Sequence, residues 1–271
     1  MMRRARKGQV FLVDNDVLRA IADAAEITAD ETVLEIGMGR GELTQHLVRR
    51  AREVVAVELE EGFVDAAARD FAPYDNLTIV HANILDVEWG ELVAADSPVV
   101  VVGNIPYCIT GPILALLSAH RAQIKRWVLT LQKEVAERIC ASPGGKVYGA
   151  LSVKLQLQGK PYYAFTIPAA AFRPPPEVNS ALVTYEYLEE SRGGGEDVAL
   201  FEYFVDFLFA ARRKKMAKRL ATLLGGRLAV AEVAAEMRAA GFDPDARPEQ
   251  VSPEDFAGLY RAFKSYVVPT T

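Results

Sequence analysis

From residue 32 onward, short apolar runs alternate with segments of helical composition, and this alternation limits the possible folds more than any other feature. The runs predicted as strands are Thr32–Ile36, Glu53–Leu59, Leu77–His81, Pro98–Gly103 and Arg126–Leu131. The segments predicted as helices between them are Glu42–Arg52, Glu60–Asp70, Thr110–His120 and Lys133–Cys140. Nearly continuous apolar strands that alternate with helices are typical of a parallel sheet covered on both faces. The pattern therefore predicts a doubly wound α/β fold.

The rhythm changes after Cys140. A helix is predicted over Tyr148–Gln158, followed by two β-type runs, Tyr162–Ile167 and Asn179–Tyr187, which we expect to close the sheet with an antiparallel edge. The glycine-rich segment 189–197 is typical of a linker. The helices predicted beyond it are Phe201–Ala211, Lys214–Leu224, Leu228–Ala240 and Pro253–Phe263. The sequence thus predicts a first domain over residues 1–190 and a small helical domain over residues 191–271.

Composition excludes several classes of protein. The 271 residues are 51% hydrophobic and 25% charged, values of an ordinary globular chain rather than a disordered or collagen-like one. No apolar run reaches the roughly 18 residues of a membrane helix. Cys108 and Cys140 lack the spacing of a metal site or a disulfide framework. We expect a cytoplasmic protein with no membrane span and no metal.

The turn after the first predicted strand carries Gly37, Gly39 and Gly41. Glycines at such a turn let the backbone approach a ligand closely. Glu58 ends the next predicted strand, where a carboxylate can accept hydrogen bonds from both hydroxyls of a ribose. A dinucleotide fingerprint would need glycine where Glu42 stands, and a carboxylate there repels a pyrophosphate. The spacing E-x-G-x-G-x-G resembles motif I of class I methyltransferases, whose cofactor S-adenosylmethionine has a ribose but no phosphate; a purely structural turn is the alternative.

A second motif, Asn104-Ile-Pro-Tyr107, follows the fourth predicted strand. Ligands of open α/β sheets collect outside the carboxyl ends of the strands, so this motif should face the same crevice as Gly37 and Glu58. The Asn104 amide oxygen and a backbone carbonyl held by Pro106 can accept both hydrogens of an exocyclic amine, and the Tyr107 ring can stack on a base. Adenine N6 or cytosine N4 would suit this site; a proline turn beside a buried tyrosine is the alternative.

Five segments together make residues 7 to about 260 resemble the small-subunit ribosomal RNA adenine N6-dimethyltransferase family. They are the entry segment KGQVFLVD (7–14), motif I (34–44), the ribose-binding acid Glu58, the N-I-P-Y motif (104–107) and the F-x-P-x-P-x-V-x-S segment (172–180). The resemblance implies a class I, Rossmann-like methyltransferase fold and S-adenosylmethionine as cofactor.

The resemblance also implies roles for individual residues. The implied cofactor-binding residues are Gln9, Val10, Leu12, Gly37, Gly39, Glu58, Asn83, Ile84 and Asn104. The implied catalytic residues are Asn104, Pro106, Tyr107 and Phe172, with Phe172 stacking on the target adenine opposite Tyr107. A core position is the alternative for Phe172. The family usually has Asp where Asn83 stands and Asn or His where Val10 stands, so the effect of both departures on cofactor affinity stays open.

Although the formal charge is −5, positive charge is concentrated in two places. The denser run, which we predict to bind RNA phosphates, contains Arg212, Arg213, Lys214, Lys215, Lys218 and Arg219. Met216, Leu220, Leu223 and Leu224 form an apolar stripe at helical spacing beside it. A second arm holds Arg3, Arg4, Arg6 and Lys7. A solvated charged surface is the alternative for both.

We therefore expect an enzyme that places two methyl groups on N6 of each of two adjacent adenosines in small-subunit ribosomal RNA. We expect it to act as a monomer, on RNA within a partly assembled small subunit. The nearest alternative is a large-subunit ribosomal RNA adenine dimethylase of the antibiotic-resistance type. An N6-adenine DNA methyltransferase fits less well because its usual tetrad has two prolines. A non-catalytic ribosome-assembly factor or transcription factor that kept the fold is a further alternative.

Overall fold

The structure, a computed structural model, describes residues 10–94, 97–192 and 197–267, and it divides into two compact units. The first unit runs to Ala136 and includes Tyr162–Tyr187; the second comprises Glu137–Pro161 and continues from Leu188. The strands are β1 (Phe11–Leu12), β2 (Thr32–Ile36), β3 (Glu53–Glu58), β4 (Leu77–His81), β5 (Val99–Asn104), β6 (Ile124–Gln132), β7 (Gly159–Ile167), β8 (Phe172–Arg173) and β9 (Ser180–Tyr187). The α-helices are α1 (Asn15–Ala24), α2 (Thr44–Leu47), α3 (Glu61–Asp70), α4 (Trp89–Leu92), α5 (Thr110–Ala119), α6 (Lys133–Ile139), α7 (Ala150–Gln156), α8 (Val198–Phe209), α9 (Met216–Leu223), α10 (Val230–Ala239) and α11 (Pro253–Phe263).

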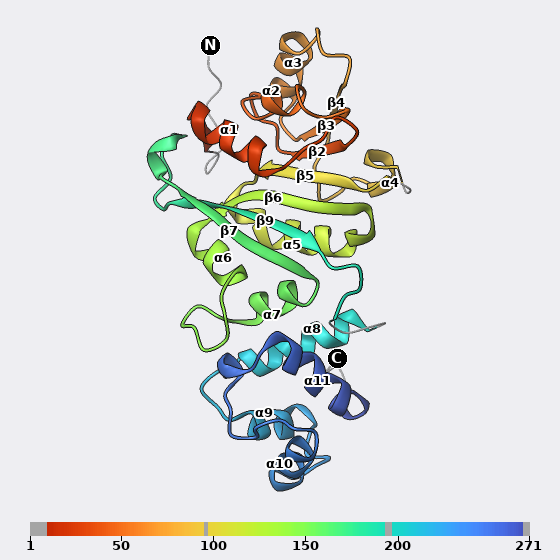
Figure 1. Cartoon of the computed structure of the whole chain (residues 1–271), viewed down its shortest axis with the longest axis vertical. Coiled ribbons are helices and arrows are strands. Elements are labelled where there is room, and N and C mark those ends of the chain that lie inside the picture. Colours follow the sequence, from red (N-terminus) through yellow and green to blue (C-terminus); the bar gives the residue numbers. More distant parts are fainter. Residues whose placement is uncertain (1–9, 95–96, 193–196, 268–271) are drawn as a thin grey trace. The chain divides into compact units, whose positions relative to one another are not determined.

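The main sheet of the first unit has the strand order β4-β3-β2-β5-β6-β9-β7 (Figure 1). Strands β4, β3, β2, β5 and β6 pair in parallel, and β9 pairs antiparallel with β6. This confirms the predicted doubly wound, mostly parallel sheet with an antiparallel strand near its edge. The chain order reverses between β2 and β5, and such a switch point is where an open α/β sheet forms its ligand crevice.

The central strands are buried because both faces of the sheet are covered. All five residues of β2 are buried, as are Val99, Val100, Val101, Val102 and Gly103 of β5. Continuous β-branched runs such as Val99–Val102 suit this environment, since neither face needs a polar side chain. The five strands predicted for the parallel part of the sheet therefore agree with the observed ones to within two residues at each end, whereas β7 begins three residues before the predicted run Tyr162–Ile167.

Two elements near the start of the described chain were not predicted. Helix α1 begins after Asp14, whose carboxylate accepts hydrogen bonds from the backbone of Asp16 and Val17 at 3.0 and 3.2 Å. Strand β1 pairs antiparallel with β8, so that Leu12 lies opposite Phe172. A two-residue strand with a distant partner leaves no periodic signal in the sequence.

The predicted helix over 42–52 is regular only over Thr44–Leu47. Around it, backbone hydrogen bonds between residues three apart mix with bonds between residues four apart. His46 N–H donates to the Leu43 carbonyl and Arg50 N–H to the Leu47 carbonyl, whereas Ala51 N–H also donates to Leu47. The Thr44 hydroxyl is turned inward to a buried carboxylate at 2.6 Å. The segment is therefore a series of turns around one short helix.

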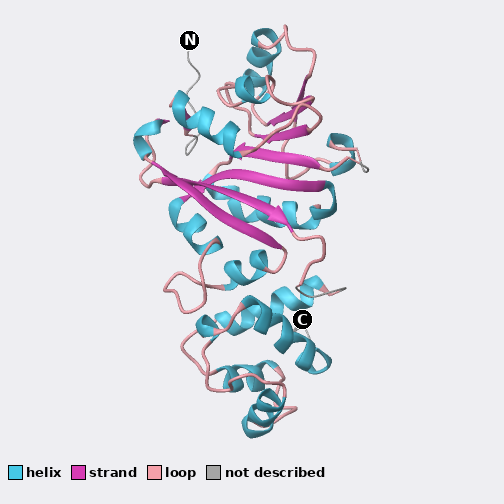
Figure 2. Ribbon diagram, viewed as in Figure 1, coloured by secondary structure: helices cyan, strands magenta, loops and turns pink. Residues whose placement is uncertain are grey.

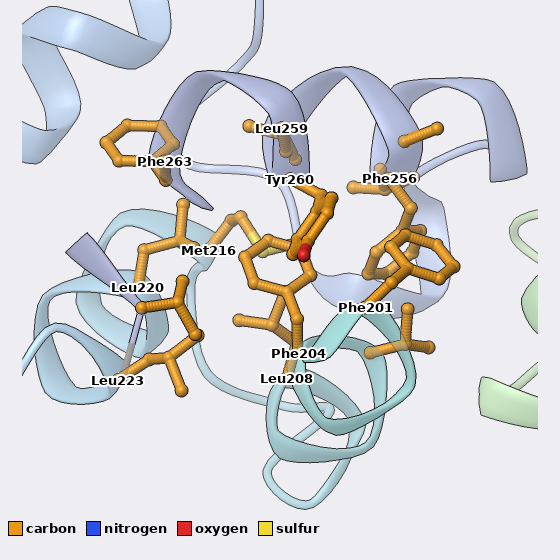
Figure 3. Close-up of a cluster of buried hydrophobic side chains, with 14 of the residues drawn as sticks. Phe201, Phe204, Leu208, Met216, Leu220, Leu223, Phe256, Leu259, Tyr260 and Phe263 are labelled. Carbon is orange, nitrogen blue, oxygen red and sulfur yellow. The ribbon is translucent and has the colours of Figure 1, made fainter. Parts of the chain in front are cut away.

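The second unit has a hydrophobic core of its own, and its described residues from 197 onward form only helices and loops (Figure 2). Figure 3 shows Phe204, Leu208 and Tyr260 meeting in that core. The predicted stripe is confirmed, because Met216, Leu220, Leu223 and Leu224 are all buried there. Ser252 caps α11 by accepting a hydrogen bond from Asp255 N–H at 3.0 Å, as the sequence also predicts.

Residues 137–161 belong to the second unit, although the sequence placed them in the first domain. The Tyr148 hydroxyl donates to the Val251 carbonyl at 2.8 Å, and Val153 and Leu157 belong to the same core as the helices that follow. Leu188 N–H and Arg192 N–H donate to the carbonyls of Gln158 and Leu157, both at 2.9 Å. One residue just before the expected linker and one within it are thus bonded to the two residues that follow α7.

None of the helices among the described residues is both long enough and apolar enough to span a bilayer.

Candidate active site

The glycine turn follows β2 at the switch point of the sheet. Gly37, Gly39 and Gly41 have φ values of +74°, +57° and +84°, the region that side chains other than glycine rarely adopt. A Cβ on Gly41 would also clash with the Phe71 ring. Gly37 N–H donates to the Val57 carbonyl at 2.9 Å, which ties the turn to β3. The turn therefore leaves a backbone surface open at the carboxyl edge of the sheet.

Sheet register brings three motifs together at this edge. Ile36 lies opposite Val57 on one side and Gly103 on the other. The next residue along the chain is Gly37 just after β2, Glu58 at the end of β3 and Asn104 at the end of β5, so these three residues lie at the same level on neighbouring strands. This arrangement is the one expected from the sequence.

Glu58 is buried, with 6% of its surface exposed, and its carboxylate faces the glycine turn. Oε2 accepts from Gly39 N–H and Oε1 accepts from Glu60 N–H, both at 2.8 Å. Two backbone donors fix the plane of the carboxylate. Its orientation is therefore set before any ligand binds, with the remaining lone pairs available to hydroxyl donors.

A single pocket joins these groups. Of the predicted site residues, those that line it are Val10, Leu12, Gly37, Gly39, Glu58, Asn83, Ile84, Asn104 and Pro106. Gln9 and the basic arm at residues 3–7 lie outside the described residues. Among the described residues that line the pocket, the only ionisable side chains are the carboxyls of Glu35, Glu42 and Glu58. The pocket thus has no basic side chain from the described part of the chain to hold a phosphate.

Glu35 was not singled out from the sequence, although it is the acid of E-x-G-x-G-x-G. Its side chain is 1% exposed, and burial raises its pKa from 4.5 to about 8. Thr44 Oγ1 donates to Glu35 Oε2 at 2.6 Å, which favours the charged form and so opposes part of that rise. Burial also raises the pKa of Glu42. Burial therefore disfavours the charged form of both Glu35 and Glu42.

The wall nearest the start of the described chain is held by Phe11 of β1. Its ring lies 5.5 Å from the Phe63 ring of α3 in an edge-to-face arrangement. The Arg40 guanidinium lies 4.6 Å above the same ring, a cation–π contact from within the glycine turn. Both Phe11 and Phe63 line the pocket. These contacts fasten the predicted entry segment to the glycine turn and to α3.

Asn83 follows β4 and forms a tight turn. Its Oδ1 accepts from Leu85 N–H at 3.2 Å, and its Nδ2 donates to Asp86 Oδ2 at 2.7 Å. A carbonyl oxygen has two lone pairs, so Oδ1 retains capacity for a second donor. The geometry thus accommodates the acceptor role that the sequence suggests for Asn83.

Tyr107 begins a short 3₁₀ turn, Tyr107–Ile109, just beyond the pocket. It is half-buried and does not line the pocket itself. Its hydroxyl lies 2.6 Å from Ser180 Oγ, and burial raises the pKa of the phenol above its usual 10.0. The hydroxyl therefore stays protonated and is no general base at neutral pH.

The Phe172 ring is not exposed for the stacking on adenine that the sequence suggested. It is 0% exposed and belongs to the hydrophobic cluster that contains Leu12 and Ile167. A ring without exposed surface cannot stack on a base in this conformation. The structure therefore favours the core alternative for Phe172, because its pairing with Leu12 across β1 and β8 points it inward.

The basic run divides into two groups. Arg212 and Arg219 are held within the protein: Arg212 Nε donates to Glu249 at 2.8 Å, and the Arg219 guanidinium lies 4.1 Å above the Phe207 ring and donates to its carbonyl. Arg213, Lys214, Lys215 and Lys218 are exposed. Lys215 pairs with Asp245 at 2.9 Å, and both are exposed. Most of the run lies in the turn before α9, because that helix begins at Met216 rather than Lys214.

No group of three or more His, Cys, Asp or Glu side chains within the described ranges is arranged to hold a metal ion.

Comparisons with a family model and with known proteins agree on one family. The model of a family described as ribosomal RNA adenine dimethylase matches residues 2–263. A relative from Geobacillus thermodenitrificans, named ribosomal RNA small subunit methyltransferase A, is 36% identical over 260 residues, which are 94% of this chain and 89% of that relative. A relative of the same name from Myxococcus xanthus is 38% identical over 257 residues, with coverage of 94% and 89%.

Two solved structures share the fold over nearly the whole chain. A dimethyladenosine transferase from Plasmodium falciparum has a TM-score of 0.80 at 24% identity, covering 94% of this chain and 98% of that one. The 23S rRNA methyltransferase ErmE has a TM-score of 0.74 at 24% identity, covering 94% and 99%. With the sheet order, they confirm the class I methyltransferase fold. At this identity the likeness concerns the fold and does not choose between substrates.

Proposed function

The chain belongs to the ribosomal RNA adenine dimethylase family. We propose that it transfers two methyl groups from S-adenosylmethionine to N6 of each of two adjacent adenosines in small-subunit ribosomal RNA. The observation that carries the proposal is a single pocket that joins the glycine turn, Glu58 and Asn104. The small-subunit assignment rests on the names of relatives that are 36% and 38% identical.

The pocket fits the proposed cofactor. When bound, S-adenosylmethionine supplies a methyl group on a positively charged sulfonium and carries no phosphate. The described lining has carboxyls as its only ionisable groups, which suits a cation and disfavours a pyrophosphate. Glu58 would accept hydrogen bonds from the ribose hydroxyls, and Asn83 would accept one from the adenine amine. Val10 and Leu12 add apolar surface to the same lining.

The proposed chemistry is positioning rather than acid–base catalysis. The exocyclic amine of adenine is a poor nucleophile because its lone pair is delocalised into the ring. The Asn104 amide oxygen and the carbonyl of Ile105, which Pro106 follows, accept both amine hydrogens and favour a more tetrahedral nitrogen. Tyr107 provides the ring that stacks on the base. Two transfers require that the site also accept the monomethylated amine.

RNA contact is proposed for the exposed part of the basic run, Arg213, Lys214, Lys215 and Lys218. These cations would bind backbone phosphates, and the target base would be extruded into the site. Arg212 and Arg219, whose guanidinium groups are engaged within the protein, would support the turn. We further propose that the protein acts as a monomer in the cytoplasm on a partly assembled small subunit.

Asn104→Ala tests the catalytic assignment. The variant should bind RNA as the parent does and lose methyl transfer by about 100-fold or more, because an acceptor that acts mainly in the transition state is removed. Asn76→Ala is a matched control: its Nδ2 donates to the carbonyls of Val48 and Ala51, so its loss should lower stability and not block transfer. Transfer at the parental rate by Asn104→Ala would remove Asn104 from the mechanism.

The substrate is tested with the parent protein and labelled S-adenosylmethionine. Undermethylated small subunits, naked small-subunit RNA and large-subunit RNA are incubated separately, then digested, and monomethyladenosine and dimethyladenosine are quantified. Dimethyladenosine from small subunits alone is the expected result. Product from large-subunit RNA would favour the antibiotic-resistance type of enzyme, and no product from any of the three would contradict the proposed activity.

A further inference from the structure

The hydroxyl of Tyr107 is joined to a residue distant in the chain. Its oxygen lies 2.6 Å from Ser180 Oγ, so one of the two hydroxyls donates to the other. Tyr107 belongs to the N-I-P-Y motif, and Ser180 is the last residue of the F-x-P-x-P-x-V-x-S segment. The contact is therefore a direct link between the two motifs that the sequence assigns to the substrate side of the site.

Sheet topology explains how the first residue of β9 reaches the active site. Asn104 of β5 lies opposite Thr130 of β6, and Gln132, two residues further along β6, lies opposite Ser180. Because β9 runs antiparallel to β6, its beginning lies at the edge where the parallel strands end. Ser180 is thus delivered to the same edge as Asn104.

Ser180 is a rigid anchor. It is 0% exposed, and its neighbour Asn179 is bonded on both sides: the Asn179 carbonyl accepts from Lys133 N–H, and its Oδ1 accepts from Ala169 N–H, both at 3.0 Å. A buried hydroxyl needs a partner, because an unsatisfied one loses its hydration without compensation. The Tyr107 hydroxyl is the side-chain partner that the structure gives to Ser180.

Tyr107, in contrast, lies in a short turn between β5 and α5. It starts a single 3₁₀ turn directly after Pro106, and its N-terminal neighbour makes no side-chain cap. A tyrosine side chain rotates about two bonds, so a ring on such a turn needs a contact at its far end to hold one orientation. The hydroxyl, which stays protonated, provides that contact.

We infer that Ser180 is a positioning residue for methyl transfer, which holds the Tyr107 ring in the orientation that stacks on the target base. Ser180 does not touch the reacting atoms and takes no proton from them. This inference rests on the proposed role of Tyr107 in the reaction.

The test is a double-mutant cycle with Ser180→Ala, Tyr107→Phe and the double variant. Each single variant removes the hydrogen bond and keeps the aromatic ring. Each should lower kcat on small subunits by about 3- to 10-fold, the range for one neutral hydrogen bond, with the KM for S-adenosylmethionine unchanged. In the Tyr107→Phe background, Ser180→Ala should have no further effect on kcat, because its partner is already gone.

Ser152→Ala is the matched control. Ser152 is also 0% exposed, and its hydroxyl donates to the Arg138 carbonyl in the second unit. Its loss should lower the melting temperature and leave kcat unchanged. A parental kcat for Ser180→Ala, or losses that multiply in the double variant, would overturn the inference.

A second readout does not depend on activity. In protein labelled with ¹³C-tyrosine, the Tyr107 signal is identified by its absence in Tyr107→Phe. Ser180→Ala should shift and broaden that signal, and Ser152→Ala should leave it in place. An unchanged signal would overturn the inference. If the parent protein makes no methyladenosine, the proposed function has failed, and the spectrum still decides whether Ser180 holds the ring.

Discussion

The carboxyl of Glu35 shows how much one buried side chain shapes the site. It lies at the end of a fully buried strand, beside the backbone turn that the cofactor would approach, and Thr44 is its hydrogen-bonding partner. The sequence contained this residue in its glycine motif, yet burial is a property of the folded sheet. The pKa shift could therefore not be inferred from spacing alone.

Glu35→Gln should change how stability depends on pH. With a pKa of about 8 in the folded protein against 4.5 ordinarily, Glu35 keeps a proton that the unfolded chain has released. Its contribution to stability is therefore complete below about pH 4.5 and is lost as the pH rises toward 8. Glutamine keeps an acceptor for Thr44 and does not titrate. Urea unfolding at pH 5.5 and 8.0 should show a smaller decrease in stability for the variant than for the parent, and equal decreases would contradict the assignment.

At the scale of elements, the parallel strands and the amphipathic helices were predictable because each carries its own pattern. Strand β4 and helix α11 have the predicted bounds, and Ser252 caps α11 as expected. The pairing of β1 with β8 and the contact between Tyr107 and Ser180 were not predictable, because each joins segments far apart in sequence. The inclusion of 137–161 in the second unit has the same cause: tertiary packing, rather than local composition, decides it.

The β1–β8 pair gives a test of Phe172. If its ring serves the core, Phe172→Leu should keep methyl transfer near the parental rate and cost less than about 1.5 kcal/mol of unfolding free energy, while Phe172→Ala should cost about 3–5 kcal/mol. If its ring stacks on adenine, leucine should abolish transfer at little cost in stability. Chemical unfolding and a methylation assay on both variants separate the two roles.

The turn before α9 gives a second test at this scale. Replacing Lys214, Lys215 and Lys218 by glutamine should weaken RNA binding and flatten its salt dependence, by about 0.7 to 0.9 in slope for each phosphate that the protein no longer neutralises. S-adenosylmethionine binding should not change. The matched control replaces three other exposed cations of the same unit, Lys160, Arg261 and Lys264, and alters net charge equally. Equal slopes for the two triple variants would exclude Lys214, Lys215 and Lys218 from the RNA-binding surface.

For the whole molecule, the important feature is that each unit has its own hydrophobic cluster. The proposed cofactor pocket is lined by residues of the first unit. S-adenosylmethionine at 100 times its Kd should stabilise the unit that binds it by about 2.7 kcal/mol. Hydrogen exchange should therefore slow in peptides from β2, β3 and β5 and remain unchanged in α8–α11. NAD, the control, should protect neither set, and uniform slowing would show that the two units unfold together.

The pairing of β1 with β8 also sets the order in which the protein can become functional during its own synthesis. The parallel partners of β2 to β5 lie nearer in sequence, as in the pair Val33 and Val100, but Phe11 must wait for Arg173 to leave the ribosome. Closing so long a loop is slow relative to local pairing. The wall of the pocket that Val10 and Leu12 supply is therefore completed late, and a nascent chain that ends before residue 173 lacks a finished cofactor site.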